Sequence, residues 1–248
     1  MTIQGVRRLF GDPTNGRKRA ITIDMLARMA PVVRATRKGQ PKLATKLGAV
    51  WAAMLTGFFG MLRKDNLTKG KQDPFNPSRG LRRGDVSIDG DQMWLRLRVA
   101  KTIQYQEEPH VLGILATHGA LCPVRAVHKH LEDTPGLGHA QFLFMEKGTG
   151  KRGAAAVPLS HQSLVRGIKQ LVAAIGEDPK KHSGQSLRRG GATLTYDVGV
   201  SEVAIQAHGN SRSEAVRIYR EWSTEQQLAL PARLAHAARA KCRQVGAA

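Results

Sequence analysis

The sequence is short of cysteine and of long hydrophobic runs. Its only two cysteines, Cys122 and Cys242, lie far apart among 248 residues, which argues against a disulfide framework or a thiolate metal site and favours a reducing, intracellular compartment. No apolar run approaches the ~20 residues that cross a bilayer, and the first residues lack the apolar core of a signal peptide. We therefore expect neither a disulfide-rich secreted domain nor a membrane-spanning protein.

Acidic residues are also scarce. The chain has 19 Asp and Glu against 39 Lys and Arg, a formal net charge of +20. Because such an excess makes a compact fold repel itself, a polyanionic partner is expected. An acidic membrane surface is the competing partner, but the basic residues recur in nearly every segment instead of gathering on one amphipathic helix. The charge therefore favours nucleic acid.

The hydrophobic pattern predicts an α+β protein that is mainly helical. Helical spacing of apolar residues, with caps at Thr22 or Asp24 and at Ser160 and a Pro123 start, marks most of the helices. The expected helices cover about 22–36, 42–62, 123–134, 161–175, 186–198, 201–207, 212–220 and 223–244. The second is apolar enough to be core, and Pro231 is expected to interrupt the last.

One small antiparallel sheet is expected beside the helices. Residues 93–100 alternate apolar and basic side chains at period two, which predicts a strand that presents Arg96 and Arg98 on one face. Residues 85–88, just before a "DGD" turn, are its expected hairpin partner, and 109–114 is the third strand.

Four short stretches carry the candidate chemistry. "GFFGMLRKDNL" places Arg63 after the apolar helix, "RVAKTIQ" places Lys101 at a strand end, "SLRRGG" supplies Arg188 and Arg189, and "EAVRIYREW" places Tyr219 on a short helix. Each alone has an ordinary interpretation: the cations as solvated surface residues and the tyrosine as a packing residue. Two adjacent arginines at a helix start are equally consistent with a surface charge pair and with an anion clamp.

Taken in order, these stretches, ending in "HGNSRSEAVRIY", resemble the catalytic domain of tyrosine recombinases and integrases, most closely the Crypton and DIRS-type enzymes of eukaryotic mobile elements. The likeness runs from about residue 20 to 222. It implies a helical DNA breaking-rejoining fold with a three-stranded sheet. It divides the chain into a basic linker that ends a missing N-terminal DNA-binding domain (1–20), the catalytic domain (21–222) and a helical tail that docks on a neighbouring subunit (223–248).

The resemblance implies a role for each matching residue. Arg63 and Arg188 would grip the scissile phosphate, Lys101 would protonate the 5′-oxygen leaving group, and Tyr219 would be the nucleophile that forms a 3′-phosphotyrosine. No cofactor or metal is implied, and His110, His118 and Cys122 lack the paired spacing and fourth ligand of a zinc site. The residues expected to contact DNA outside the reacting phosphate are Arg96, Arg98, Arg189 and Arg212.

Two positions depart from the family pattern. Gln185 stands where a histidine is usual three residues before the second arginine, and Asn210 stands where histidine or tryptophan is usual nine residues before the tyrosine. Both amides can donate hydrogen bonds to phosphate oxygens, but neither carries a proton as histidine does. His182 and His208 are the nearby histidines that could stand in if the local geometry shifts, but the favoured interpretation is a loop histidine for His182 and a packed helix-end histidine for His208.

The implied partners are double-stranded DNA and further copies of the chain, as a tetramer on two duplexes, with no membrane and no small-molecule ligand. The expected location is the nucleus in a eukaryote, or the cytoplasm and nucleoid in a prokaryote. The leading function is site-specific recombination or integration, as in a transposable element. Two alternatives stay open: a DNA-binding module that has lost catalysis, and a nicking-closing enzyme of the type IB topoisomerase kind.

Overall fold

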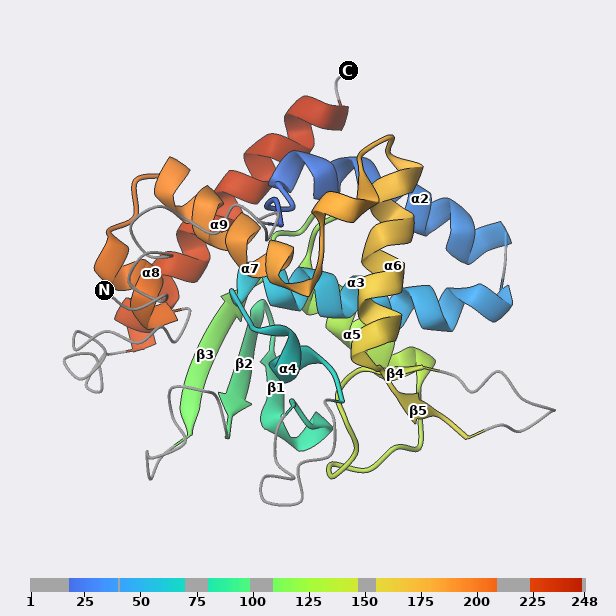
Figure 1. Ribbon diagram of the computed structural model, residues 1–248. Helices are drawn as coiled ribbons and strands as arrows, with labels where there is room; N and C mark the ends of the chain where they lie inside the picture. Colours follow the sequence, from blue (N-terminus) through green and yellow to red (C-terminus); the bar gives the residue numbers. More distant parts are fainter. Residues whose placement is uncertain are drawn as a thin grey trace, which may run out of the picture.

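The computed structural model describes residues 18–39, 41–69, 80–98, 109–146, 155–208 and 224–246. It is mainly helical with a small antiparallel sheet (Figure 1), as predicted. The helices are α2 (Ile23–Gly39), α3 (Pro41–Phe59), α4 (Lys64–Leu67), α5 (Pro123–Asp133), α6 (His161–Ala174), α7 (Gly184–Asp197), α8 (Glu202–His208) and α9 (Thr224–Gly246). Within these ranges, no helix combines the length and the apolar character that crossing a bilayer requires.

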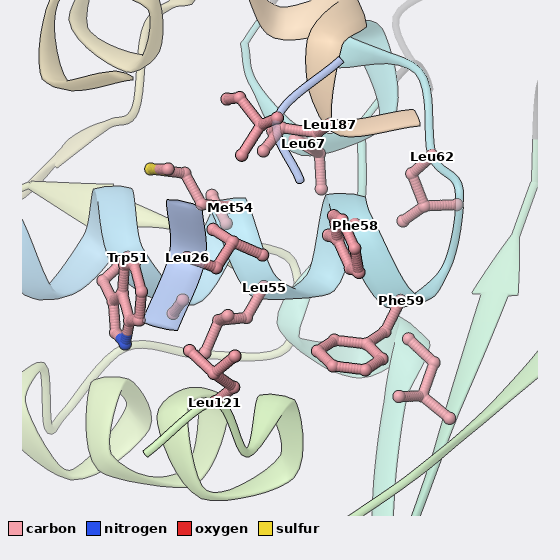
Figure 2. Packing of buried hydrophobic residues seen from close by; sticks show 14 of the residues in the cluster. Leu26, Trp51, Met54, Leu55, Phe58, Phe59, Leu62, Leu67, Leu121 and Leu187 are labelled. Atoms are coloured by element: carbon pink, nitrogen blue, oxygen red, sulfur yellow. The ribbon is translucent and has the colours of Figure 1, made fainter. Parts of the chain in front are cut away.

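Helix α3 forms the centre of the hydrophobic core. Its apolar residues face neighbours on every side, so the helix is stable only where other elements cover it completely. Met54, Leu55 and Phe58 are fully buried. In Figure 2 they pack among side chains from α2, α4 and α7 and from the segment before α5, with Leu26 and Leu121 on two sides of the helix. This core holds the carboxyl end of α3, from which the chain continues to Arg63.

The three-stranded sheet has the order β1-β2-β3, with β1 at Val86–Asp89, β2 at Gln92–Leu97 and β3 at His110–Leu115. The β1–β2 turn uses Gly90 at φ 53°, where glycine avoids the strain of a side chain. Met93, Leu95 and Leu97 of β2 are buried whereas Arg96 is exposed, which confirms the predicted alternation. A second antiparallel pair consists of two strands of two residues each, β4 (Met145–Glu146) and β5 (Val157–Pro158). It was not predicted because strands this short show no periodicity in the sequence.

Helix α9 continues through Pro231, so the predicted interruption is wrong. Proline removes one backbone donor, but the buried residues Leu230, Leu234 and Ala238 bind the helix to the rest of the chain on both sides of it. α9 packs against α2, α7 and β3 of its own chain, and Arg239 donates hydrogen bonds to the carbonyls of Ala116 and Thr117 at 2.7 and 2.9 Å. Docking of the tail on a neighbouring subunit stays a prediction.

Acid should destabilise the fold through buried His130. Its Nε2 accepts a hydrogen bond from the Met145 amide at 3.1 Å, and burial, helped by the charge of Arg83, lowers its pKa from 6.5 to about 4. Between these pH values the unfolded chain binds the proton more readily than the folded one, so stability falls as pH falls from about 6.5 towards 4. From pH 7 to 4.5 we expect His130 to contribute a loss of about 2 kcal/mol.

Urea unfolding of the protein and of His130→Gln at the two pH values measures this contribution. The glutamine keeps an acceptor for the Met145 amide but does not titrate, so the variant should lose about 2 kcal/mol less than the parent on acidification. An equal loss in both proteins would show that His130 is not the titrating group.

Candidate active site

The turn between α3 and α4 and the first half of α7 enclose a pocket of about 380 Å³. It brings together three of the predicted site residues, Arg63, Gln185 and Arg188, although Arg63 lies more than a hundred positions before the other two in the sequence. The complete lining is Arg63, Lys64, Asp65, Gln185, Arg188, Arg189 and Ala192. The lining therefore carries four cationic side chains and one carboxylate. This excess of positive charge suits the pocket to an anion.

The turn between α3 and α4, which has an unusual backbone conformation at Met61, places Arg63 at the pocket. Met61 adopts a φ of 47°, a left-handed conformation that is strained for a large side chain and persists only where the surroundings enforce it. Met61 is also buried, with 1% of its surface exposed. Arg63 lies two residues further on and directly precedes α4, whose Asn66 amide donates to the Arg63 carbonyl at 2.9 Å.

Arg188 lies on α7 and donates a hydrogen bond to that turn. Its guanidinium donates a hydrogen bond to the Met61 carbonyl at 2.7 Å. Burial and then the charge of Arg63 lower the pKa of Arg188 to about 10, so the side chain is still charged at neutral pH. Two positive charges held this close repel each other, and an anion between them relieves the repulsion.

Gly190 and Gly191 let α7 approach the core backbone closely. A Cβ atom at Gly190 would lie 1.8 Å from the Ile21 carbonyl oxygen, and one at Gly191 would lie 2.1 Å from the Phe58 carbonyl oxygen. Both distances are far below van der Waals contact, so only glycine fits. This close approach sets how near Arg188 lies to the α3 end.

Neither of the two nearby histidines lines the pocket. His182 is buried after a short 3₁₀ turn, Pro179–Lys181, and His208 is buried with its Nε2 3.0 Å from the Phe59 carbonyl oxygen. Gln185 is exposed and does line the pocket. Among the pocket's described lining residues, the group at the usual histidine position is thus an amide that does not titrate.

Only some of the remaining predicted site residues lie within the described part of the chain. Lys101, Asn210, Arg212 and Tyr219 lie outside the described residues. Arg96 and Arg98 are both exposed, but the Arg98 Nε also pairs with the buried Asp85 carboxylate at 2.5 Å. Arg189 lines the pocket and donates to the Lys18 carbonyl. Contact of these residues with DNA stays a prediction.

Sequence reasoning missed Lys64 and Asp65, which line the pocket beside Arg63. The available signal was their position directly after Arg63, because residues at the first turn of α4 lie beside its N-cap. Over the described part of the chain, no cluster of three or more His, Cys, Asp or Glu side chains is arranged to hold a metal ion.

The fold is similar to that of solved protein structures. No protein-family model and no curated protein sequence matches the chain. The XerH site-specific recombinase bound to difH substrate, in a pre-cleavage complex, aligns with a TM-score of 0.53 at 12% identity over 84% of this chain and 52% of XerH. The post-cleavage complex of XerH with a palindromic difH substrate aligns with a TM-score of 0.53 at 12% identity. This alignment covers 96% of this chain and 55% of the XerH chain.

The chain therefore spans about half the length of the recombinase chains that it matches. The particular closeness to Crypton and DIRS-type enzymes stays a prediction. At this level of identity the likeness establishes the arrangement of helices and sheet, to which α7 and the α3–α4 turn belong. The chain has the tyrosine recombinase fold.

Proposed function

We propose that the protein is a DNA strand transferase that cuts and rejoins duplex DNA through a 3′-phosphotyrosine at Tyr219, as in site-specific recombination or integration. The observation that carries the proposal is the pocket in which Arg63, Gln185 and Arg188 meet. Two guanidiniums from separate elements can bracket one phosphate and stabilise the charge that develops on its non-bridging oxygens. The net charge of +20 supports a polyanionic substrate.

In this scheme the Tyr219 hydroxyl gives its proton to solvent water as its oxygen attacks the phosphorus atom. The bond from phosphorus to the 5′-oxygen breaks, and Lys101 gives that oxygen a proton as it leaves. A 5′-hydroxyl of another strand then attacks the phosphotyrosine and releases the tyrosine. Because each step exchanges one phosphate ester for another, no energy source is needed. Gln185 and Asn210 would donate hydrogen bonds to phosphate oxygens.

A covalent adduct is the direct test. The protein is incubated with a pool of nicked duplexes of randomised sequence. After cleavage the short strand diffuses away, so no 5′-hydroxyl remains to reverse the reaction and the covalent intermediate accumulates. A DNA-protein band on a denaturing gel is expected for the parent protein and for Tyr196→Phe and Tyr105→Phe, and is expected to be absent for Tyr219→Phe, which should still bind duplex. An adduct that persists in Tyr219→Phe would refute the assignment of the nucleophile.

One observation favours a second candidate, a DNA-binding module without catalysis. No histidine lines the described pocket, so its lining lacks the imidazole that could relay a proton near neutral pH. Duplex binding with no adduct from any sequence in the pool would support this candidate. Sequence-independent relaxation of supercoiled plasmid would instead indicate a type IB topoisomerase. Assembly as a tetramer on two duplexes, use by a transposable element and a nuclear location are implied by the resemblance and belong to the same proposal.

A further inference from the structure

Every carbonyl at the carboxyl end of α3 has a hydrogen-bond donor, but one donor comes from a distant side chain. A helix leaves its last four carbonyls without intrahelical partners. Here three of them accept from amides of the following turn: Thr56 from Gly60 at 2.9 Å, Gly57 from Leu62 at 3.0 Å and Phe58 from Met61 at 3.2 Å. The fourth, that of Phe59, is 3.0 Å from Nε2 of His208, 149 positions away.

His208 is suited to this single contact. Burial lowers its pKa to about 4, with the nearby charges of His110 and Arg188 acting in the same direction, so the ring is neutral at neutral pH. Because a carbonyl oxygen can only accept, the neutral ring must carry its one proton on Nε2. Loss of this donor would leave the buried Phe59 carbonyl without its partner.

The contact lies two residues before the strained position. Met61 holds its left-handed conformation between Phe59, bonded to α8 through His208, and its own carbonyl, bonded to α7 through Arg188. With one of these bonds removed, the turn can relax towards an unstrained conformation, and Arg63 would move with it. Displacements of about 1 Å in a positioned catalytic group can cost about 10²-fold in rate.

We propose that His208 is a positioning residue of the strand-transfer site, which fixes the turn that carries Arg63 by bonding the end of α3 to α8. His208 is not among the residues that line the pocket. His208 is the last residue of α8 and lies eleven positions before Tyr219 in the sequence. The proposal rests on the function proposed above.

The test compares His208→Leu, which removes the donor, with His208→Gln, whose amide can still donate to Phe59. His130→Leu is the matched control, because it removes another buried, hydrogen-bonded histidine that does not contact the α3–α4 turn. In single-turnover adduct formation at saturating duplex, we expect His208→Leu to be slower by about 10- to 100-fold with duplex affinity within about threefold. His208→Gln should recover most of the rate, and His130→Leu should stay within about threefold of the parent.

Hydrogen exchange of the free protein gives a readout that does not depend on activity. The amides of Gly60, Met61 and Leu62 should exchange about 10-fold faster in His208→Leu, and at the parent rate in His130→Leu. Unchanged exchange in a folded His208→Leu protein, or His208→Gln exchanging as fast as His208→Leu, would overturn the proposal. Absence of adduct from the parent protein would refute the strand-transfer function instead, while the exchange result still decides whether His208 holds the turn.

Discussion

Replacing Arg188 with alanine should lower the rate of covalent adduct formation by about 10³-fold or more. The guanidinium has two uses in the structure: it lines the pocket with Arg63, and it bonds the carbonyl of the strained Met61. Alanine removes one of two charges that would stabilise the transition state, and it also loosens the turn that carries the other. The effect should therefore exceed that of removing one ordinary phosphate contact, and it is measured by single-turnover adduct formation.

Arg34→Ala is the matched control, because it removes the same charge from an exposed site on α2. It should leave the rate within about threefold of the parent, with a slightly lower affinity from the lost positive charge. Arg188→Lys keeps the charge but cannot reproduce the planar fork of donors, so only a small part of the rate should return. A rate for Arg188→Ala within tenfold of the parent would show that this pocket is not the reacting site.

Replacing Gly190 with alanine should cost about 4 kcal/mol or more of stability, a large share of the about 5–15 kcal/mol that a typical domain has. The new Cβ would lie 1.8 Å from the Ile21 carbonyl oxygen and 2.7 Å from the Phe58 ring. Overpacking against a flexible side chain costs about 1–3 kcal/mol, and a carbonyl of the main chain yields less readily. Helix α7 would have to move away from the core, and Arg188 with it.

Gly138→Ala is the control for this substitution, since nothing lies within 4 Å of a Cβ at Gly138 and its φ is not in the left-handed region. Urea unfolding should place this variant within about 0.5 kcal/mol of the parent. Gly190→Ala should instead be largely unfolded in buffer or unfold at a much lower urea concentration. A difference below about 1 kcal/mol between Gly190→Ala and the parent would mean that α7 does not pack as closely as described.

The features that the sequence predicted are those with local signals. The apolar run of α3 predicted a core helix, and the period-two alternation around Met93 and Leu95 predicted a strand with one buried face. The Ser160 cap of α6 is also confirmed, with Ser160 Oγ accepting from the Ser163 amide at 3.0 Å. The meeting of Arg63, Gln185 and Arg188 was expected only because of the motif resemblance, since periodicity carries no information about contacts between distant segments.

The features that were missed depend on distant contacts. Pro231 was expected to interrupt its helix, but burial of Leu230 and Leu234 overrides the local preference. No local sequence pattern around Arg98 predicts its ion pair with Asp85, and none around His208 predicts its hydrogen bond to the Phe59 carbonyl. Asp85 is one of the few charged side chains buried in the described structure, and buried charges of this kind need a partner that only the folded chain supplies.

The long-range bonds at the Met61 turn bear on when the protein becomes competent during its synthesis. The carbonyls of Met61 and Phe59 are held by side chains 127 and 149 positions further along the chain. A ribosome that has released α3 and Arg63 has therefore not yet made the helices that force the turn into its left-handed conformation. Because that conformation is unfavourable without them, a nascent chain that ends before α7 contains the arginine but no assembled pocket. Under the proposed function, the growing polypeptide is thus expected to form no covalent adduct with DNA until its last third has been translated.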